Sequence, residues 1–278
     1  SKIAKMNLGN YPGDGNKLTL SRFQRDQLLT EDPRLSKIIK PLFGAQEFIK
    51  GLTRYCLWIN DEDLDLAMSN STIRDRIAAV EVTRTSSKDK SLNQIANRSH
   101  QYRDRNFPEN HMFLAPTVSS ENRDYLPTEL KPVNTQTTNQ AFAIYDAPLW
   151  NLAILSSRIH LLWIGAVCGK LKTDFRYSNT LGWNTFPVPK LTEKHKEDLS
   201  HCAEEILLAR EAHFPLTIAD LYKPDDMPDN LRLAHERNDE VLERVYIGRR
   251  FKNDTERLDK LFLIYSKMNS SLDVIKGI

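Results

Sequence analysis

The sequence contains no long hydrophobic run, no Pro-Pro dipeptide and only three cysteines in 278 residues. Because a helix that crosses a membrane needs roughly 18 or more consecutive apolar residues, we expect no membrane partner. Cys56, Cys168 and Cys202 are far apart, odd in number and flanked by apolar residues. This pattern favours buried free thiols in a reducing cytoplasm over a disulfide or a metal site.

Common catalytic motifs are also missing. No Gly-x-Ser-x-Gly elbow is present, the seven histidines show no zinc-binding spacing, and Gly13-Asp-Gly15 is the nearest approach to a glycine-rich loop. Asp225, Asp226 and Asp229 are grouped, but no Glu-x-Lys element follows them, so a helix cap is favoured over a magnesium site. We therefore predict that this chain is not catalytic by itself, although an enzyme with a dispersed active site stays open.

The charge of the chain is unevenly distributed. An apolar content of 40% and a charged content of 27% are ordinary for a globular protein, and the net charge is +2. Residues 190–278 carry 15 Lys and Arg against 18 Asp and Glu, whereas residues 1–189 carry 24 against 19. This balance fits nucleic acid contacts on the larger, basic part and protein contacts on the smaller, acidic part.

Hydrophobic periodicity and turn residues predict an α+β fold. Before Pro189 we expect helices at 21–30, 71–105 (interrupted near residue 85) and 148–168, and strands at 54–59, 112–118, 125–126, 141–145, 172–177 and 185–188. Pro187 and Pro189 mark a boundary, and the signals beyond them are helical only. We predict a mixed α/β domain over residues 1–189 and a helical C-terminal domain over residues 190–278.

The segment Lys172-Thr-Asp174 follows an apolar, helix-like run that ends at Gly169. We expect a short extended segment in which the side chains of Lys172 and Asp174 lie on one face, with His160 and Tyr177 in the nearby core. A lysine can donate to O6 and N7 of guanine, while an aspartate accepts from the N4 amino group of the paired cytosine. The pair is therefore a candidate for reading one G·C base pair. A surface salt bridge across the strand is the alternative.

Other polar segments are candidates for contact with bases. Ser119, Glu121 and Arg123 offer a hydroxyl, a carboxylate and a guanidinium between two strand-like pieces. Gln140 ends a run of amides and hydroxyls over residues 134–140, and an amide side chain can bind adenine bidentately. The alternatives are an ordinary capped turn for the first segment and a solvated loop for the second.

Basic residues are candidates for contact with a DNA backbone. The polar segment 71–105 carries eight Lys and Arg against four Asp and Glu. Five of these cations are the candidate phosphate contacts: Arg74, Arg76, Arg84, Lys88 and Lys90. A solvated helix face explains them equally well. Arg176, beside the Lys172 segment, either positions the strand against the backbone or pairs with Asp174.

The segments discussed above and several others, taken together, resemble the target-recognition region of MmeI-like (type IIL) restriction–modification enzymes and related single-chain adenine methyltransferases. The blocks that carry the resemblance occur in one order and are residues 6–10, 13–20, 39–49, 54–58, 118–127, 145–150, 155–160 and 160–178. In that family a Lys-x-Asp or Glu-x-Arg pair just before a Tyr/Phe-Arg-Tyr-Ser segment is a swappable base-reading element. Here Lys172 and Asp174 precede Phe175-Arg-Tyr-Ser178 in that arrangement.

The resemblance implies a sequence-specific DNA recognition fragment of a longer protein, and the start, with neither an initiator methionine nor a signal peptide, fits a fragment. Adenine methylation in that family depends on an Asn/Asp-Pro-Pro-Tyr/Phe motif, which is absent here. S-adenosylmethionine, and magnesium if the parent also cleaves DNA, would bind in the parent's missing domains. The implied partners are double-stranded DNA and the parent's own upstream methyltransferase domain, in cytoplasmic phage defence. The alternative is a protein-interaction module of a phage-defence or regulatory complex.

Overall fold

The computed structural model describes residues 2–276, and the side chains of residues 2–268. Helices make up 49% and strands 15%, and they form two compact units, each with its own hydrophobic core. Unit 1 comprises residues 2–7, 111–130 and 142–276, and unit 2 comprises residues 8–110 and 131–141. The expected α+β class, with helices alone at the C-terminal end, is confirmed.

Unit 2 is built around a four-stranded sheet with the order β2-β4-β3-β8. Its strands are β2 (Thr19–Leu20), β3 (Ile39–Phe43), β4 (Tyr55–Leu57) and β8 (Gln136–Thr137). β4 pairs antiparallel with β2 and β3, and β8 pairs parallel with β3. Leu20, Leu42 and Leu57 from three of the strands are buried, so the sheet contributes directly to the core of this unit.

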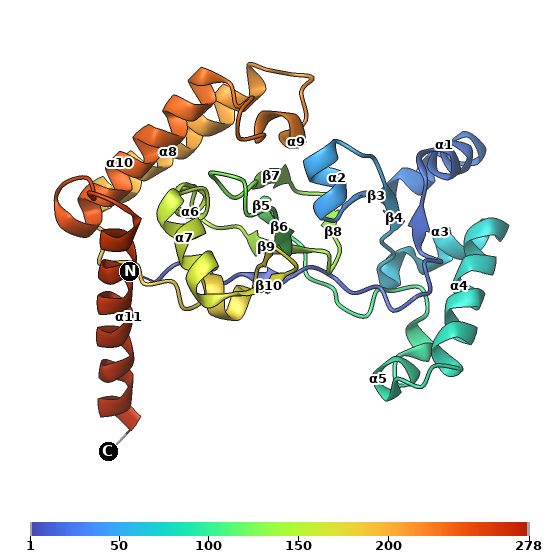
Figure 1. Cartoon of the computed structure of the whole chain (residues 1–278). Helices are drawn as coiled ribbons and strands as arrows, with labels where there is room; N and C mark the ends of the chain where they lie inside the picture. Colours follow the sequence, from blue (N-terminus) through green and yellow to red (C-terminus); the bar gives the residue numbers. More distant parts are fainter. Residues whose placement is uncertain (1, 277–278) are drawn as a thin grey trace. The chain divides into compact units, whose positions relative to one another are not determined.

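Short helices surround this sheet (Figure 1). They are α1 (Arg22–Glu31), α2 (Ala45–Lys50), α3 (Leu64–Ser69), α4 (Ser71–Thr85) and α5 (Lys90–Asn93). Ser21 caps α1 as expected, since its side chain accepts from the backbone N–H of Gln24. The expected break near residue 85 is also confirmed, but the helix does not resume to residue 105: only α5 and a 3₁₀ turn follow.

Most residues of a second four-stranded sheet, with the order β1-β9-β5-β7, belong to unit 1. Its strands are β1 (Asn7–Leu8), β5 (His111–Pro116), β7 (Glu129–Pro132) and β9 (Ala141–Tyr145). Helices α6 (Trp150–Leu155) and α7 (Arg158–Val167) follow β9 in the chain. A single helix over 148–168 was expected; the structure has two, because α6 ends before Ser156 and Ser157 caps a new helix by accepting from His160 N.

A three-stranded antiparallel sheet with the order β10-β11-β6 completes the strands of unit 1. It consists of β6 (Val118–Ser119), β10 (Gly169–Leu171) and β11 (Asp174–Arg176). β10 and β11 are neighbours in the chain, whereas β6 comes from about fifty residues earlier. This long-range pairing is what gives the candidate site its form.

Four helices form the C-terminal part: α8 (Glu193–Glu211), α9 (Ile218–Leu221), α10 (Asp229–Ile247) and α11 (Asp254–Lys276). α8 packs against α6 and α10, and α11 packs against α7, so these helices share the core of unit 1 (Figure 1). The predicted domain boundary at Pro189 therefore falls inside unit 1. In the described part of the chain, no helix is both long and apolar enough to cross a membrane.

Candidate nucleic-acid interface

The Lys172 segment forms a β-hairpin rather than one extended strand. Leu171 of β10 lies opposite Asp174 of β11, so Lys172 and Thr173 are the two turn residues. Lys172 has a left-handed backbone, with φ of 58°. The expectation that Lys172 and Asp174 share a strand face is therefore wrong, because the chain reverses between them. Lys172 lies instead at the exposed tip of the hairpin.

The hairpin has one packed face and one outer face. Phe175 pairs with Ser119 of β6, and its ring packs against Gly165 of α7, where a Cβ atom would lie 3.2 Å from the ring. Side chains alternate along a strand, so Asp174 and Arg176 share the opposite face, and Arg176 is exposed. Within the described residues no ion pair joins Asp174 to Lys172 or Arg176. The salt bridges proposed as alternatives for these residues are therefore not found.

The loop that follows β6 lies beside the hairpin, because β6 is the strand next to β11. Lys170 Nζ of β10 donates to Glu121 Oε2 at 2.8 Å. The loop turns tightly, with Arg123 N donating to Ser120 O. The β6–β11 pairing thus brings Glu121 and Arg123 together with the hairpin, although they are about fifty residues apart in the chain. Lys170, which the sequence reasoning missed, links the two segments.

Ser119 does not belong to this exposed set. Its side chain is only 1% exposed, and Oγ has no hydrogen-bond partner among the described residues. Pairing with Phe175 places Ser119 on the inner face of the three-stranded sheet. A hydroxyl buried there cannot reach a base edge in this structure. The prediction of Ser119 as a base contact is therefore wrong.

Arg123 is half-buried and lines a cavity of about 370 Å³. The apolar part of the cavity wall includes Leu161, Phe175 and Leu258. Burial lowers the pKa of the Arg123 guanidinium, and the carboxylate of Asp174 opposes that shift. The Arg123 side chain forms no hydrogen bond or ion pair with any other residue that the structure describes. It is therefore a partly desolvated cation whose five N–H donors are available to a phosphate or a base edge.

Arg84 of α4 is a structural residue of unit 2. Its side chain is fully buried. Its guanidinium donates to the backbone carbonyls of Pro12, Gly13, Ile95, Arg98 and Gln101. Because a guanidinium has five N–H donors, all of them are used within the protein. The prediction that Arg84 contacts a phosphate is therefore wrong.

The other candidate cations of unit 2 differ in how much of their charge is exposed. Arg76 donates to two backbone carbonyls near β2, and burial lowers its pKa. Arg74 donates to one carbonyl at 3.3 Å but stays exposed. Lys88 and Lys90 are exposed where α4 gives way to α5. Arg74, Lys88 and Lys90 keep the accessibility that a phosphate contact needs, whereas Arg76 keeps it only in part.

Gln140 is exposed between β8 and β9. Its backbone N–H donates to Thr138 Oγ1 at 3.3 Å. Its side-chain oxygen lies close to Gly44, where a Cβ atom would be 2.9 Å away. An exposed amide at this place fits both adenine recognition and a solvated loop, so its role stays a prediction.

The turn that contains Gly13 and Gly15 does not have the form of a methyl-donor loop. A Cβ atom at Gly13 would lie 2.5 Å from Leu92, and one at Gly15 would lie 3.3 Å from Thr83. Asp14, only 2% exposed, accepts from backbone N–H groups of the same turn. Protein atoms therefore pack closely around both glycines of this turn. Among the described residues no group of three or more His, Cys, Asp or Glu side chains is placed to hold a metal ion.

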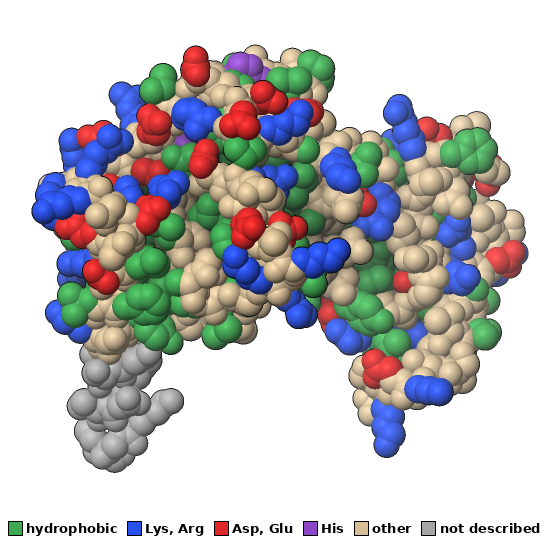
Figure 2. Space-filling model, in the orientation of Figure 1, with side chains coloured by type: hydrophobic (Ala, Val, Ile, Leu, Met, Phe, Trp, Pro, Cys, Tyr) green, Lys and Arg blue, Asp and Glu red, His purple; other side chains and the backbone are tan. Residues whose placement is uncertain are grey.

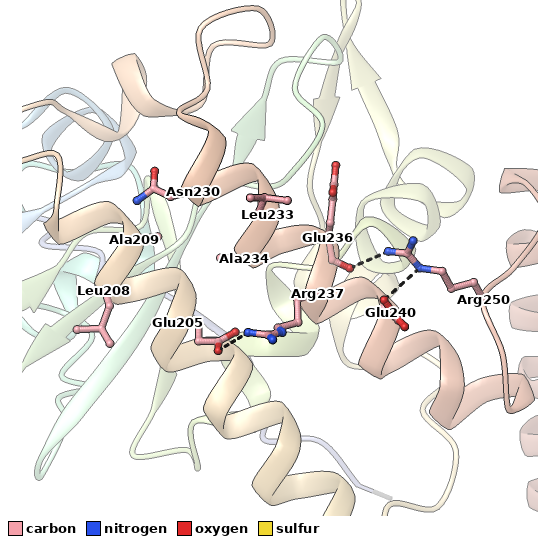
Figure 3. A pocket seen from close by; sticks show the side chains of 10 residues that line it. All are labelled: Glu205, Leu208, Ala209, Asn230, Leu233, Ala234, Glu236, Arg237, Glu240 and Arg250. Carbon is pink, nitrogen blue, oxygen red and sulfur yellow. Dashed lines mark hydrogen bonds and ion pairs between the residues drawn. The ribbon is translucent and has the colours of Figure 1, made fainter.

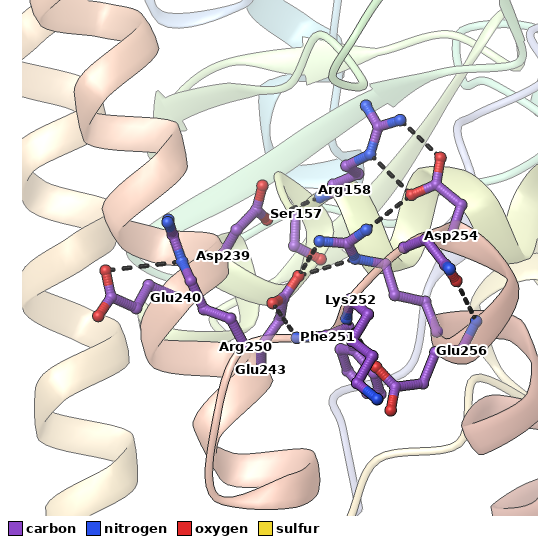
Figure 4. A network of polar contacts seen from close by, with 12 residues as sticks. Ser157, Arg158, Asp239, Glu240, Glu243, Arg250, Phe251, Lys252, Asp254 and Glu256 are labelled. Atoms are coloured by element: carbon purple, nitrogen blue, oxygen red, sulfur yellow. Dashed lines mark hydrogen bonds and ion pairs between the residues drawn. The ribbon is translucent and has the colours of Figure 1, made fainter.

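A partly buried polar network connects α10 with α7 and α11 (Figure 4). Asp239 of α10 accepts hydrogen bonds from Tyr125 Oη and Arg158 N, each at 2.9 Å. Arg158 also forms an ion pair with Asp254 at 2.7 Å. Burial raises the pKa of Asp239 to about 7. Sequence reasoning missed this network because Tyr125 and Asp239 are 114 residues apart and belong to no local motif.

A groove of about 690 Å³ lies along α8 and α10 (Figure 3). Leu208 and Leu233, exposed by 64% and 63%, line part of it, and Arg237 pairs with Glu205 at 2.8 Å within it. Figure 2 shows acidic and basic side chains intermixed over the C-terminal helices on the face that it displays. On that face these helices carry no continuous basic band of the kind that follows a DNA backbone.

Comparison with known proteins assigns both parts of the chain. Residues 1–190 match the family described as the MmeI target recognition domain, and residues 191–273 match the MmeI C-terminal domain. The chain belongs to the MmeI family. The resemblance expected from the sequence blocks is therefore confirmed over nearly the whole length.

Two relatives show how much of an MmeI-family protein is present. The chain is 39% identical to DNA methyltransferase A of Bacillus subtilis (strain 168) over 268 residues, which are 96% of this chain and 30% of that protein. A solved structure of the type IIL restriction–modification enzyme MmeI in complex with DNA is 31% identical, with a TM-score of 0.91. That match covers 97% of this chain and 36% of the MmeI chain. The chain spans about a third of the length of these relatives.

Proposed function

We propose that this chain is the sequence-reading part of a DNA methyltransferase or bifunctional restriction–modification polypeptide, and that it binds double-stranded DNA. The observation that carries the proposal is the pairing of β6 with β11. It places the loop with Glu121 and Arg123 next to the hairpin with Lys172 at its tip, so that polar groups from two distant segments form one surface. Membership of the MmeI family supports DNA as the ligand.

In this proposal Lys172, Asp174, Glu121 and Arg123 contact base edges, because charged donors and acceptors distinguish base pairs in the major groove. Gln140 contributes a further base contact from unit 2. Phosphate contacts come from the exposed cations Arg74, Lys88, Lys90 and Arg176 and from the partly exposed Arg76, and these contacts set the register of the protein on the duplex. The family match favours this function over the protein-interaction module that the sequence left open.

We further propose that catalysis belongs to the rest of the parent polypeptide. An upstream methyltransferase domain would bind S-adenosylmethionine and methylate adenine after flipping it out of the duplex. Magnesium would be needed only by a parent that also cleaves DNA. Cytoplasmic phage defence fits a restriction–modification system. The names of the relatives support a methyltransferase parent, and the reading frame upstream of Ser1 tests it, since an Asn-Pro-Pro-Tyr-type motif is expected there.

A salt titration tests DNA binding directly. Binding of the 278-residue chain to a random-sequence duplex is measured between about 50 and 200 mM salt, where each neutralised phosphate adds about −0.9 to the slope of log affinity against log salt. Replacing both Lys88 and Lys90 by Gln is expected to make the slope shallower by roughly 2. A flat salt dependence in the unaltered chain contradicts the proposal.

The matched control removes the same charge from the C-terminal helices. Lys194 and Lys223 are exposed and lie in or beside those helices. The double change of both to Gln lowers the net charge equally but touches no candidate contact. An equal effect of the two double variants would mean that total charge, not a defined phosphate-binding surface, controls binding.

A further inference from the structure

Three side chains of the C-terminal helices are bonded to the segment that follows the base-contact loop. Asp239 of α10 accepts from Tyr125 Oη at 2.9 Å. Arg210 of α8 donates to Thr128 O at 2.8 Å and to Thr128 Oγ1 at 3.3 Å. A third tie joins Arg232 of α10 to Asp124 at 3.3 Å. The chain from 124 to 128 is therefore attached to two different helices within unit 1.

Two of these ties, Asp239–Tyr125 and Arg210–Thr128, are buried and supported by further contacts, whereas Arg232 and Asp124 are 34% and 40% exposed. The side chains of Arg210, Tyr125 and Asp239 are all less than 9% exposed. The ring of His235 stacks on Tyr125 with centroids 4.1 Å apart. His235 is itself held by Tyr222 Oη, which also accepts from Arg210 Nε at 2.8 Å. The helices thus hold Tyr125 by its hydroxyl and by its ring face, which leaves it little freedom to move.

The loop is therefore anchored on both sides. Before it, Ser119 is paired with β11; after it, residues 124–128 are tied to α8 and α10. Residues 120–123 between the anchors carry Glu121 and Arg123. A contact that distinguishes bases needs its groups held within roughly half an ångström, so the anchors matter more for discrimination than for general attraction to DNA.

We propose that Asp239, Arg210 and Arg232 are positioning residues for sequence discrimination. Through Tyr125, Thr128 and Asp124 they fix the loop that presents Glu121 and Arg123 to the bases. The C-terminal helices thereby determine how sharply the protein selects its site. This inference rests on the proposed DNA-reading function of the loop.

The test compares discrimination with affinity. The chain and its variants are incubated with a pool of duplexes that contain a randomised 12-base-pair segment, and bound and unbound duplexes are sequenced. The test variant combines Tyr125→Phe with Arg232→Gln, which removes two ties while keeping the aromatic ring and the buried Asp239–Arg158 bond. We expect base preference to weaken about threefold to tenfold at one or more positions. Affinity for the unselected pool should change less than about twofold.

Two controls separate positioning from stability. Arg257→Gln breaks the ion pair of Arg257 in α11 with the buried Glu243 of α10, and its pair with Asp254 within α11, and it touches no part of the loop. Thermal melting of the test variant and of Arg257→Gln shows whether the two lose comparable stability. If they do, Arg257→Gln should keep the base preference of the unaltered chain. Rescue is tested with a second double variant, Tyr125→Phe combined with Arg232→Lys. This variant keeps a cation opposite Asp124 and should recover part of the base preference that the test variant loses.

The experiment distinguishes failure of the proposed function from failure of the positioning inference. If the unaltered chain selects no sequence from the pool, the proposed function fails. If it selects a sequence and the test variant selects the same one equally sharply, the positioning inference is overturned while the proposed function stands. Equal weakening by Arg257→Gln at equal stability overturns the inference as well, because it would show a general effect of loosening the helices.

Discussion

Two regions of this protein were singled out for their charged side chains, and the structure treats them in opposite ways. In α4 of unit 2, Arg84 is buried and every one of its N–H donors is bonded to a backbone carbonyl. At the hairpin and loop of unit 1, Lys172 is exposed and Arg123 is without a bonded partner among the described residues. Both regions are rich in cations, but only the second offers them to a ligand.

The partners of a cation, rather than its presence, indicate whether it belongs to a binding surface. A guanidinium that donates to five backbone carbonyls does what backbone N–H groups do in helices and sheets. Without it, those carbonyls would be buried without a hydrogen bond. A half-buried guanidinium without such partners is costly to maintain, and a ligand with acceptor atoms removes that cost.

Changing Arg84 to Gln should produce the largest loss of stability. Several buried carbonyls lose their donor, and each unsatisfied group costs roughly 1–3 kcal/mol, so the free energy of unfolding should fall by at least about 3 kcal/mol. Urea denaturation of the two proteins measures this. The matched control is Arg74→Gln on the same helix, an exposed site expected to change stability by less than about 0.5 kcal/mol. A stable Arg84→Gln protein with weakened DNA binding would reverse the comparison.

Exchanging the charges at the hairpin should change sequence preference and leave stability nearly intact. Lys172→Glu combined with Asp174→Arg is expected to turn the preference at one position from G toward C, with each contact worth roughly 1–3 kcal/mol. Selection from the randomised pool, and a methylation map of the full-length parent, report the preference. Either single change should mostly abolish binding, because the tip and the adjoining strand of one hairpin then present two like charges to the DNA. An unchanged motif in the double variant means that the hairpin does not read bases.

Acid should weaken the core behind the hairpin through His160. Burial lowers the pKa of His160 to about 4, while Tyr177 Oη donates to its Nε2. The folded pKa is below the unfolded value of about 6.5, so stability is present above pH 6.5 and is lost as the pH falls toward 4. From pH 7 to 5 this loss amounts to about 2 kcal/mol. In His160→Gln, the decrease in the free energy of unfolding between pH 7 and pH 5 should be smaller by that amount, as measured by denaturation at both pH values.

Asp239 should act in the opposite direction over the same range. Its folded pKa of about 7 lies above the unfolded value, so the stability that it contributes is present at low pH and is lost as the pH rises through 7. Asp239→Asn should therefore remove a gain of about 2 kcal/mol between pH 7 and 5. The same denaturation series tests this, and equal slopes in the two proteins would contradict the burial of a titrating carboxyl.

The smallest effect is expected at the ion pair that links the hairpin to the loop. Lys170 and Glu121 are 51% and 34% exposed, and exposed pairs contribute at most about 1 kcal/mol. Lys170→Gln should therefore leave the melting temperature nearly unchanged, whatever it does to base preference. A large loss of stability would mean that the hairpin depends on this pair rather than on the packing of Phe175 against Gly165.

Some features followed from the sequence alone because their causes are local. Ser21 caps α1 through a residue three positions away, and the burial of His160 follows from the apolar run around it. Membership of the MmeI family was also readable, since short blocks in a fixed order carry it. The left-handed turn at Lys172 was not, because two-residue hairpin turns are usually signalled by glycine, asparagine or aspartate where φ is positive, and lysine occupies that position here.

The sequence by itself determined which residue types occupy the candidate site: Lys172 and Asp174, the loop with Glu121 and Arg123, and the cations of residues 74–90. Only the tertiary structure decided which of them are available. Strand pairing buries Ser119, and Arg84 is buried with its donors bonded to backbone carbonyls, so neither can contact DNA. The fold also brings Asp239 into contact with Tyr125, which is 114 residues away in the chain. The physical reason is that a polar side chain bonds to whatever the fold places beside it, and those neighbours are set by long-range packing rather than by the local sequence.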